Sequence, residues 1–277
     1  MALIKSLLRI TLGVIIAIPL LLYPLLYFAQ DKLIFMPRKM DKNILNWIRE
    51  EYPNAEVQIT TPDNIRLHGW YIKNTAQKKA PLIIYFGGNA EEVSGQLMAL
   101  EPLLNTWSLL LVNYRGYGLS EGSPSEKHLF NDAVLLYDTF GADSDKIVAF
   151  GRSLGTGVAV YLAAQRPLKG VILVSPYDSI RHLAQKNYPY VPVSYLLKHH
   201  FDSLALAPSI KTPMLALIAA KDRIIPPSHS FALIEAWGGV TQQQIISGTN
   251  HNNITMGTGY WKYISAFLHQ LTKIPPT

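Results

Sequence analysis

The chain has 277 residues, of which 49% are hydrophobic and 16% are charged, and its formal net charge at pH 7 is +6. A charged fraction below the usual value of about 25% excludes intrinsic disorder, and the length allows one large domain with an appendage. The sequence has no cysteine, which excludes a disulfide scaffold, a thiol nucleophile and cysteine-ligated metal sites. Because it contains no run of five basic residues, the positive charge does not indicate a nucleic-acid-binding protein.

The amino-terminal region contains an uncharged stretch over residues 10–30 that is rich in leucine, isoleucine and aromatic residues. A membrane-spanning helix needs about 20 apolar residues, so we expect an uncleaved single-pass anchor over 1–32. A cleaved signal peptide is the alternative, since Lys5 and Arg9 would suit its basic start, but Tyr27–Ala29 lacks the small-x-small pattern of a cleavage site. The basic residues on the two sides of the stretch weakly favour a cytoplasmic globular part and leave the side of the membrane open.

A basic connector is expected over 33–55 and a single α/β domain over 56–277. The domain begins with two strand-like runs, Val57–Thr61 and Ile65–Ile72, on either side of a Pro-Asp-Asn turn. Such a turn between two β-like runs predicts a hairpin.

Short, continuously apolar runs then alternate with longer helical stretches. The runs are Leu82–Phe86, Leu109–Val112, Ile147–Phe150, Val171–Val174 and Met214–Ala219. This alternation is typical of buried parallel strands joined by helices, so we expect a mostly parallel central sheet with helices on both faces. One of the helices is expected to begin with a capping box, in which Ser123 is the N-cap, Pro124 the first helical residue and Glu126 the third.

The alternation is interrupted at about 177–209 by a segment rich in tyrosine, proline, leucine and histidine. An insertion that follows the carboxyl end of a parallel strand is well placed to form a small helical lid over a site. The alternative is an ordinary connecting segment that packs against the domain.

A candidate nucleophile follows the third of the apolar runs. Gly151-Arg152-Ser153-Leu154-Gly155 is a Gly-x-Ser-x-Gly motif between a predicted strand and a predicted helix. A serine on so sharp a turn adopts a strained backbone, and the two glycines allow the strand and the helix to pass closely.

A serine hydroxyl needs a base within hydrogen-bond reach and an acid that holds the base. His251, in a loop before the last helix, is the best candidate base, and Asp222, just after the apolar run that ends at Ala219, is the best candidate acid. The chain order Ser153, Asp222, His251 is the order expected when the nucleophile lies on such a strand–turn–helix motif, and it differs from the other well-known orders of serine triads. The remaining histidines are expected to be surface or packing residues, although those of the insertion could line a pocket: His68, His128, His182, His199, His200, His229 and His269.

Two backbone N–H groups are candidates for the oxyanion hole. Asn89 lies in Gly87-Gly88-Asn89-Ala90, directly after a predicted strand, and Leu154 directly follows the candidate nucleophile. The sequence contains no phosphate-binding glycine motif and no His-Glu-x-x-His zinc motif, so no cofactor or metal is expected.

A set of short motifs identifies the chain as similar to a known family. They are Gly88-Asn89-Ala90, the segment 113–122 (NYRGYGLSEG), the motif around Ser153, the segment 176–179 (PYDS), the segment 201–203 (FDS), the segment 221–226 (KDRIIP) and His251-Asn252. Through these motifs, residues 55–272 resemble the α/β-hydrolases, and among them the membrane-anchored serine hydrolases that include the α/β-hydrolase-domain depalmitoylases. The resemblance implies Ser153 as nucleophile, Asp222 as acid, His251 as base and an oxyanion hole at Asn89 and Leu154.

Two positions depart from the family's pattern. Gly87 stands where the family commonly has histidine, and Asn253 stands where it commonly has a residue such as aspartate. Neither departure removes a member of the expected triad.

We therefore expect a membrane-anchored serine hydrolase that cleaves an ester or thioester bond through an acyl-enzyme. The expected partners are an acyl substrate, which could be lipid-like or lipidated, and a membrane. A serine peptidase of the same fold and a catalytically inert membrane-bound interaction module are the alternatives.

Overall fold

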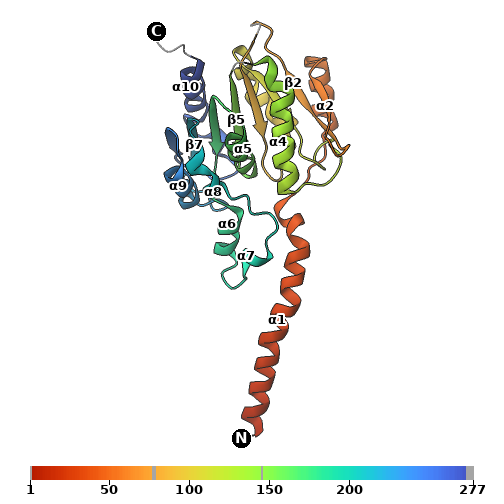
Figure 1. The fold of residues 1–277 in the computed structure, drawn as a ribbon, viewed down its shortest axis with the longest axis vertical. Coiled ribbons are helices and arrows are strands. Elements are labelled where there is room, and N and C mark those ends of the chain that lie inside the picture. Colours follow the sequence, from red (N-terminus) through yellow and green to blue (C-terminus); the bar gives the residue numbers. More distant parts are fainter. Residues whose placement is uncertain (1, 77–78, 145, 273–277) are drawn as a thin grey trace.

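The computed structural model describes residues 2–76, 79–144 and 146–272. Helix α1 (Ala2–Ile34) projects from the globular part of the molecule as a long rod (Figure 1). Among the described residues, one helix is long and apolar enough to cross a membrane, and it is α1, over Ile4–Ile34. Helix α2 (Lys42–Glu51) follows within the segment expected to be a connector, and its Ile48 is fully buried against the globular domain.

The domain is built on an eight-stranded sheet in the order β1-β2-β4-β3-β5-β6-β7-β8. The strands are β1 (Glu56–Thr60), β2 (Arg66–Ile72), β3 (Leu82–Phe86), β4 (Ser108–Val112), β5 (Ile147–Arg152), β6 (Gly170–Val174), β7 (Met214–Ala219) and β8 (Thr241–Ile246). Strands β1 and β2 form the predicted antiparallel hairpin, β2 pairs antiparallel with β4, and all other pairs are parallel. The prediction of a mostly parallel sheet is confirmed.

The central strands are buried on both faces because helices cover both sides of the sheet. Along β3, Leu82, Ile84 and Phe86 belong to one core, and Ile83 and Tyr85 belong to the other. Since successive side chains of a strand point to opposite faces, this continuous apolar run supplies both cores at once.

Different helices complete the two cores. Helices α4 (Glu126–Phe140), α5 (Leu154–Gln165) and α9 (Pro227–Ala236) contribute to the first core. Helices α2, α3 (Leu97–Leu100) and α10 (Tyr260–Thr272) contribute to the second. Short 3₁₀ turns complete the connections, at Val93–Gln96, Glu101–Asn105, Gly141–Asp143, Ala207–Ser209 and Ile254–Met256.

The predicted start of α4 is wrong by two residues. Its N-cap is Ser125, whose side chain accepts a hydrogen bond from the His128 N–H, and not Ser123. Glu126 is therefore the first helical residue, and its carboxylate accepts hydrogen bonds from the backbone N–H groups of His200 and Phe201. The glutamate that we assigned to a local cap instead ties α4 to the insertion.

The insertion expected at about 177–209 contains three short helices, α6 (Ile180–Asn187), α7 (Val193–Leu196) and α8 (Ser203–Leu206). Helix α7 lies beside the end of α1 that is nearest to the domain, and α6 packs against α7 (Figure 1).

Candidate active site

Ser153 occupies the sharp turn between β5 and α5. Its backbone has a φ of 51° and a ψ of −117°, which side chains other than glycine rarely adopt. A Cβ on Gly151 would clash with the Gly155 carbonyl oxygen, and a Cβ on Gly155 would clash with the Phe86 carbonyl oxygen. Both glycines of the motif are thus required by the close passage of strand and helix, as the motif indicated.

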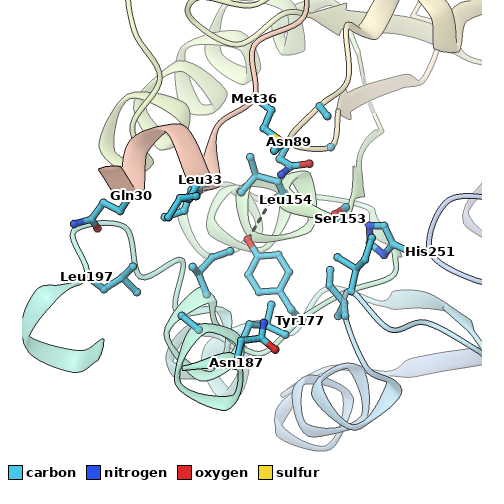
Figure 2. Close-up of a pocket in the computed structure, with 18 of the residues that line it drawn as sticks. Gln30, Leu33, Met36, Asn89, Ser153, Leu154, Tyr177, Asn187, Leu197 and His251 are labelled. Atoms are coloured by element: carbon cyan, nitrogen blue, oxygen red, sulfur yellow. Dashed lines mark hydrogen bonds between the residues drawn. The ribbon is translucent and has the colours of Figure 1, made fainter. Parts of the chain in front are cut away.

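The structure brings the three expected triad residues together. His251 Nε2 lies 2.9 Å from Ser153 Oγ, and His251 Nδ1 lies 2.8 Å from Asp222 Oδ2. All three residues are buried, and Figure 2 shows the His251 ring beside Ser153 at one side of a cavity. Residues separated by up to 98 positions therefore form one hydrogen-bonded chain.

The carboxylate of Asp222 is held by backbone donors as well as by the histidine. Its Oδ1 accepts hydrogen bonds from the Ile224 N–H (3.0 Å) and the Ile225 N–H (2.8 Å). Burial alone would raise the pKa of Asp222, but the hydrogen bonds from His251 and Ile225 outweigh it and hold the pKa below its usual value. An ionised carboxylate only accepts, so His251 Nδ1 is the donor, and its Nε2 is left to accept the Ser153 proton.

The two expected oxyanion donors lie at the same cavity as Ser153. Leu154 is the first residue of α5, and the first N–H groups of a helix have no partner within the helix. The Asn89 carbonyl accepts hydrogen bonds from the Tyr117 hydroxyl (2.6 Å) and from the Met36 N–H (3.1 Å), which fix the orientation of the loop. Burial raises the pKa of Tyr117 to about 12, so its hydroxyl remains a donor at physiological pH.

A mostly buried ion pair, which was not predicted from the sequence, connects the parts of the site. Arg152 Nη1 donates to Glu91 Oε2 at 2.8 Å, and its Nη2 donates to the His251 carbonyl oxygen at 3.3 Å. Glu91 also accepts from the Gly88 N–H (3.3 Å) and from the Tyr85 hydroxyl (2.6 Å). Burial would lower the pKa of Arg152, but the negative charge of Glu91 outweighs it and raises the pKa. The pair links the oxyanion loop, the nucleophile turn and the histidine loop.

The pair also bears on one of the departures from the family's pattern. A Cβ at Gly87 would lie 3.2 Å from Glu91 Oε1 and 3.1 Å from a methyl carbon of Val93. The Glu91 side chain thus fills the space beside the position where the family commonly has histidine. The arginine inside the Gly-x-Ser-x-Gly motif was the signal that could have revealed the pair.

Four of the other histidines contact carboxylates and do not line the cavity of Ser153. His182 and His229 both contact Asp178, His199 contacts Asp31, and His68 contacts Glu56. Among the described residues, no group of three or more His, Asp and Glu side chains is arranged to hold a metal ion.

The cavity beside Ser153 has a volume of about 760 Å³, within the range of about 300–1,000 Å³ that is usual for ligand sites. Apolar side chains of α1 and of the insertion make up much of its lining, as Figure 2 shows for Leu33 and Leu197. The histidines of the insertion do not line it.

The chain is similar to proteins from bacteria, fungi and plants, although no family model matches it. It is 35% identical to an uncharacterised protein of Mycobacterium tuberculosis over 205 residues, which cover 72% of each chain. It is 31% identical to an uncharacterised membrane protein of Saccharomyces cerevisiae over 275 residues, covering 94% of this chain and 96% of the yeast protein. It is also 26% identical to the α/β-hydrolase domain-containing protein WAV2 of Arabidopsis thaliana over 281 residues, covering 89% of each chain. The chain belongs to the α/β-hydrolase family.

Solved structures agree with this assignment at the level of the fold. The α/β-hydrolase chain superimposes on the esterase Pf2001 of Pyrococcus furiosus with a TM-score of 0.67 and 20% identity, covering 86% of this chain and 99% of that one. It superimposes on the mouse α/β-hydrolase domain-containing protein 10 with a TM-score of 0.65 and 16% identity, covering 79% of this chain and 100% of that one. The predicted α/β-hydrolase fold is thereby confirmed.

Proposed function

We propose that this α/β-hydrolase is a membrane-anchored serine hydrolase that cleaves an ester or thioester bond through an acyl-enzyme. The observation that carries the proposal is the chain of hydrogen bonds from Asp222 through His251 to Ser153, which ends at an apolar cavity. Hydrolase activity is also consistent with the esterases among the solved structures of this fold.

The reaction begins with attack of Ser153 Oγ on the carbonyl carbon of the substrate. His251 Nε2 takes the hydroxyl proton, and Asp222 stabilises the imidazolium that forms. The negative charge on the former carbonyl oxygen is stabilised by the N–H groups of Asn89 and Leu154, aided by the amino-terminal end of the α5 dipole.

Collapse of the tetrahedral intermediate breaks the bond to the leaving group, which takes the proton from His251. A water molecule then attacks the acyl-serine while His251 accepts one of its protons. The second collapse returns that proton to Ser153 Oγ and releases the carboxylic acid. Besides the substrate and this water molecule, the steps use only side chains and backbone N–H groups of the chain.

The membrane anchor of the proposal is α1. Its length and composition suit a bilayer-spanning segment, and the similar yeast protein is called a membrane protein. A fractionation test of the full chain against a variant with several charged residues in α1 checks the anchor independently of the chemistry.

Labelling by a fluorophosphonate, which modifies activated serines, tests the function. We expect the full chain to be labelled and to hydrolyse ester and thioester substrates, and Ser153→Ala to remove both, with a rate loss on the order of 10⁴-fold or more. Ser123→Ala is the control, because Ser123 is an exposed serine outside the site.

Three results would contradict the proposal. An unlabelled, folded wild-type protein would favour the inert interaction module. Faster release of amines from amides than of acids from esters with the same acyl group would favour the peptidase. Labelling that persists in Ser153→Ala would place the nucleophile elsewhere.

A further inference from the structure

The end of α1 nearest to the domain is bonded to the insertion. Gln30 is only 6% exposed; its Nε2 donates to the Leu196 carbonyl oxygen (3.0 Å) and its Oε1 accepts from the Lys198 N–H (2.7 Å). The neighbouring Asp31 contacts His199 Nε2 at 2.9 Å. A membrane anchor alone needs none of these contacts, so this end of α1 has a fixed place in the domain.

The same end of α1 forms a wall of the cavity that contains Ser153. Leu26, Gln30 and Leu33 line it at spacings of four and three residues, which places them on one face of the helix. Leu183 of α6 and Leu196 of α7 lie in the lining contributed by the insertion. In Figure 2, Leu33 and Leu197 lie at the far side of the cavity from His251.

The lining of this cavity suits an apolar ligand. Leu33 remains 54% exposed although it faces the cavity. Among the described residues that line the cavity, the Asp, Glu, Lys and Arg side chains are two, Glu91 and Arg152. These two are hydrogen-bonded to each other. A charged substrate would therefore have no unpaired Asp, Glu, Lys or Arg to bind in this lining. An apolar chain would bury the leucines, which stabilises the complex by about 25 cal/mol for each Å² of apolar surface removed from water.

The chain segment that follows α1 contacts the candidate oxyanion loop. The Met36 N–H donates to the Asn89 carbonyl oxygen at 3.1 Å, and Met36 also lines the cavity. One continuous segment from Leu26 to Met36 therefore borders both the far end of the cavity and the oxyanion loop.

We propose that the carboxyl-terminal end of α1 is part of the substrate site, where it forms with α6 and α7 a channel for a long acyl chain and sets the preference for chain length. This inference rests on the proposed function, since it concerns the substrate of the same serine. It assigns the substrate class as esters or thioesters of long-chain fatty acids, and it makes α1 a specificity element in addition to an anchor.

The test compares two p-nitrophenyl esters, the acetate and the dodecanoate, with the full chain in detergent micelles. Leu33→Trp places a bulky ring in the proposed channel. We expect it to lower kcat/KM for the dodecanoate by about ten-fold or more, as is usual when a fitted apolar pocket is altered, and to change kcat/KM for the acetate by less than about two-fold.

The matched control is Leu25→Trp, because Leu25 is 65% exposed, lies on α1 and does not line the cavity. We expect it to leave both rates unchanged. If Leu33→Trp is not recovered folded, Leu26→Trp on the same wall replaces it, with the same expected selectivity.

Several outcomes would overturn the inference. Wild-type protein that hydrolyses the acetate but not the dodecanoate, a Leu33→Trp variant that retains its dodecanoate rate, or an equal loss with both esters would each contradict a chain-binding wall. If wild type shows no Ser153-dependent turnover even of the acetate, the proposed function itself fails, and the inference fails with it.

Discussion

At the scale of single residues, the site depends on Asp222 being ionised inside the protein. Burial of a carboxylate is unfavourable, and here it is offset by the His251 ring and by two backbone N–H groups. The result is a pKa below the usual value. Folding thus stabilises the ionised form of Asp222 relative to the unfolded chain.

The direction of this pKa shift predicts how the effect of Asp222→Asn on the free energy of unfolding depends on pH. A group with a lowered folded pKa contributes stability above its unfolded pKa, about 3.9 for aspartate, and loses that contribution as the pH falls through the folded value. We expect Asp222→Asn to be less stable than wild type at neutral pH, and the difference to shrink below about pH 4. Urea unfolding of both proteins across this range measures it; a difference that grows in acid would contradict the lowered pKa.

The Glu91–Arg152 pair predicts a second effect at the residue scale. Glu91→Gln keeps the shape of the side chain but leaves the Arg152 charge without its partner in a mostly buried site. Breaking a buried pair in this way costs about 3–5 kcal/mol, and partial exposure of Arg152 favours the lower end. We expect a loss of about 3 kcal/mol by urea unfolding.

The double variant Glu91→Gln, Arg152→Met separates the charge from the shape. Because it removes the unpaired charge, we expect it to regain part of the stability that Glu91→Gln loses. Arg66→Met is the surface control, since its pair with Glu121 is exposed to solvent and contributes little to the free energy of unfolding. A double variant that is less stable than Glu91→Gln alone would show that the two side chains are not coupled in this way.

At the scale of elements, the strands could be predicted closely and the contacts between elements could not. Strands β3 and β7 match the predicted runs residue for residue, because a strand buried on both faces must be continuously apolar. The start of α4 was wrong because Ser123 and Ser125 both offer a capping side chain. In the structure Glu126 is bound to the insertion, where the His200 N–H donates to its carboxylate, and that partner lies 74 residues away in the sequence.

The contact between α1 and the insertion gives the prediction at this scale. Gln30→Leu removes the amide group that bonds to the Leu196 carbonyl and to the Lys198 N–H. Leaving these backbone groups without a partner destabilises the folded protein by about 1–3 kcal/mol. We expect faster hydrogen–deuterium exchange in α7 and at Lys198, with unchanged exchange in β3. The control is Gln243→Leu, at an exposed position of β8. Unchanged exchange in α7 would contradict the docking of α1.

At the scale of the whole molecule, the chain order of the triad and the strand-then-helix alternation were enough to predict the fold and the three side chains that meet. The role of α1 was not predictable in the same way. Its composition indicates a membrane span whether or not its end packs against a domain. The segment that follows it contacts the oxyanion loop through Met36 and Asn89, which are 53 positions apart in the sequence. The domain end of α1, which lies beside the insertion in Figure 1, thus lines the same cavity as Ser153 through Leu26, Gln30 and Leu33.

The central claim is that Ser153 carries the acyl group during turnover. The most direct measurement is to quench the full chain in acid during hydrolysis of an ester and to locate the acyl group by peptide mass spectrometry. We predict the mass of the acyl group on the peptide that contains Ser153, and its accumulation only while His251 and Asp222 are intact. An acyl group on another residue, or turnover in Ser153→Ala at the wild-type rate, would contradict it.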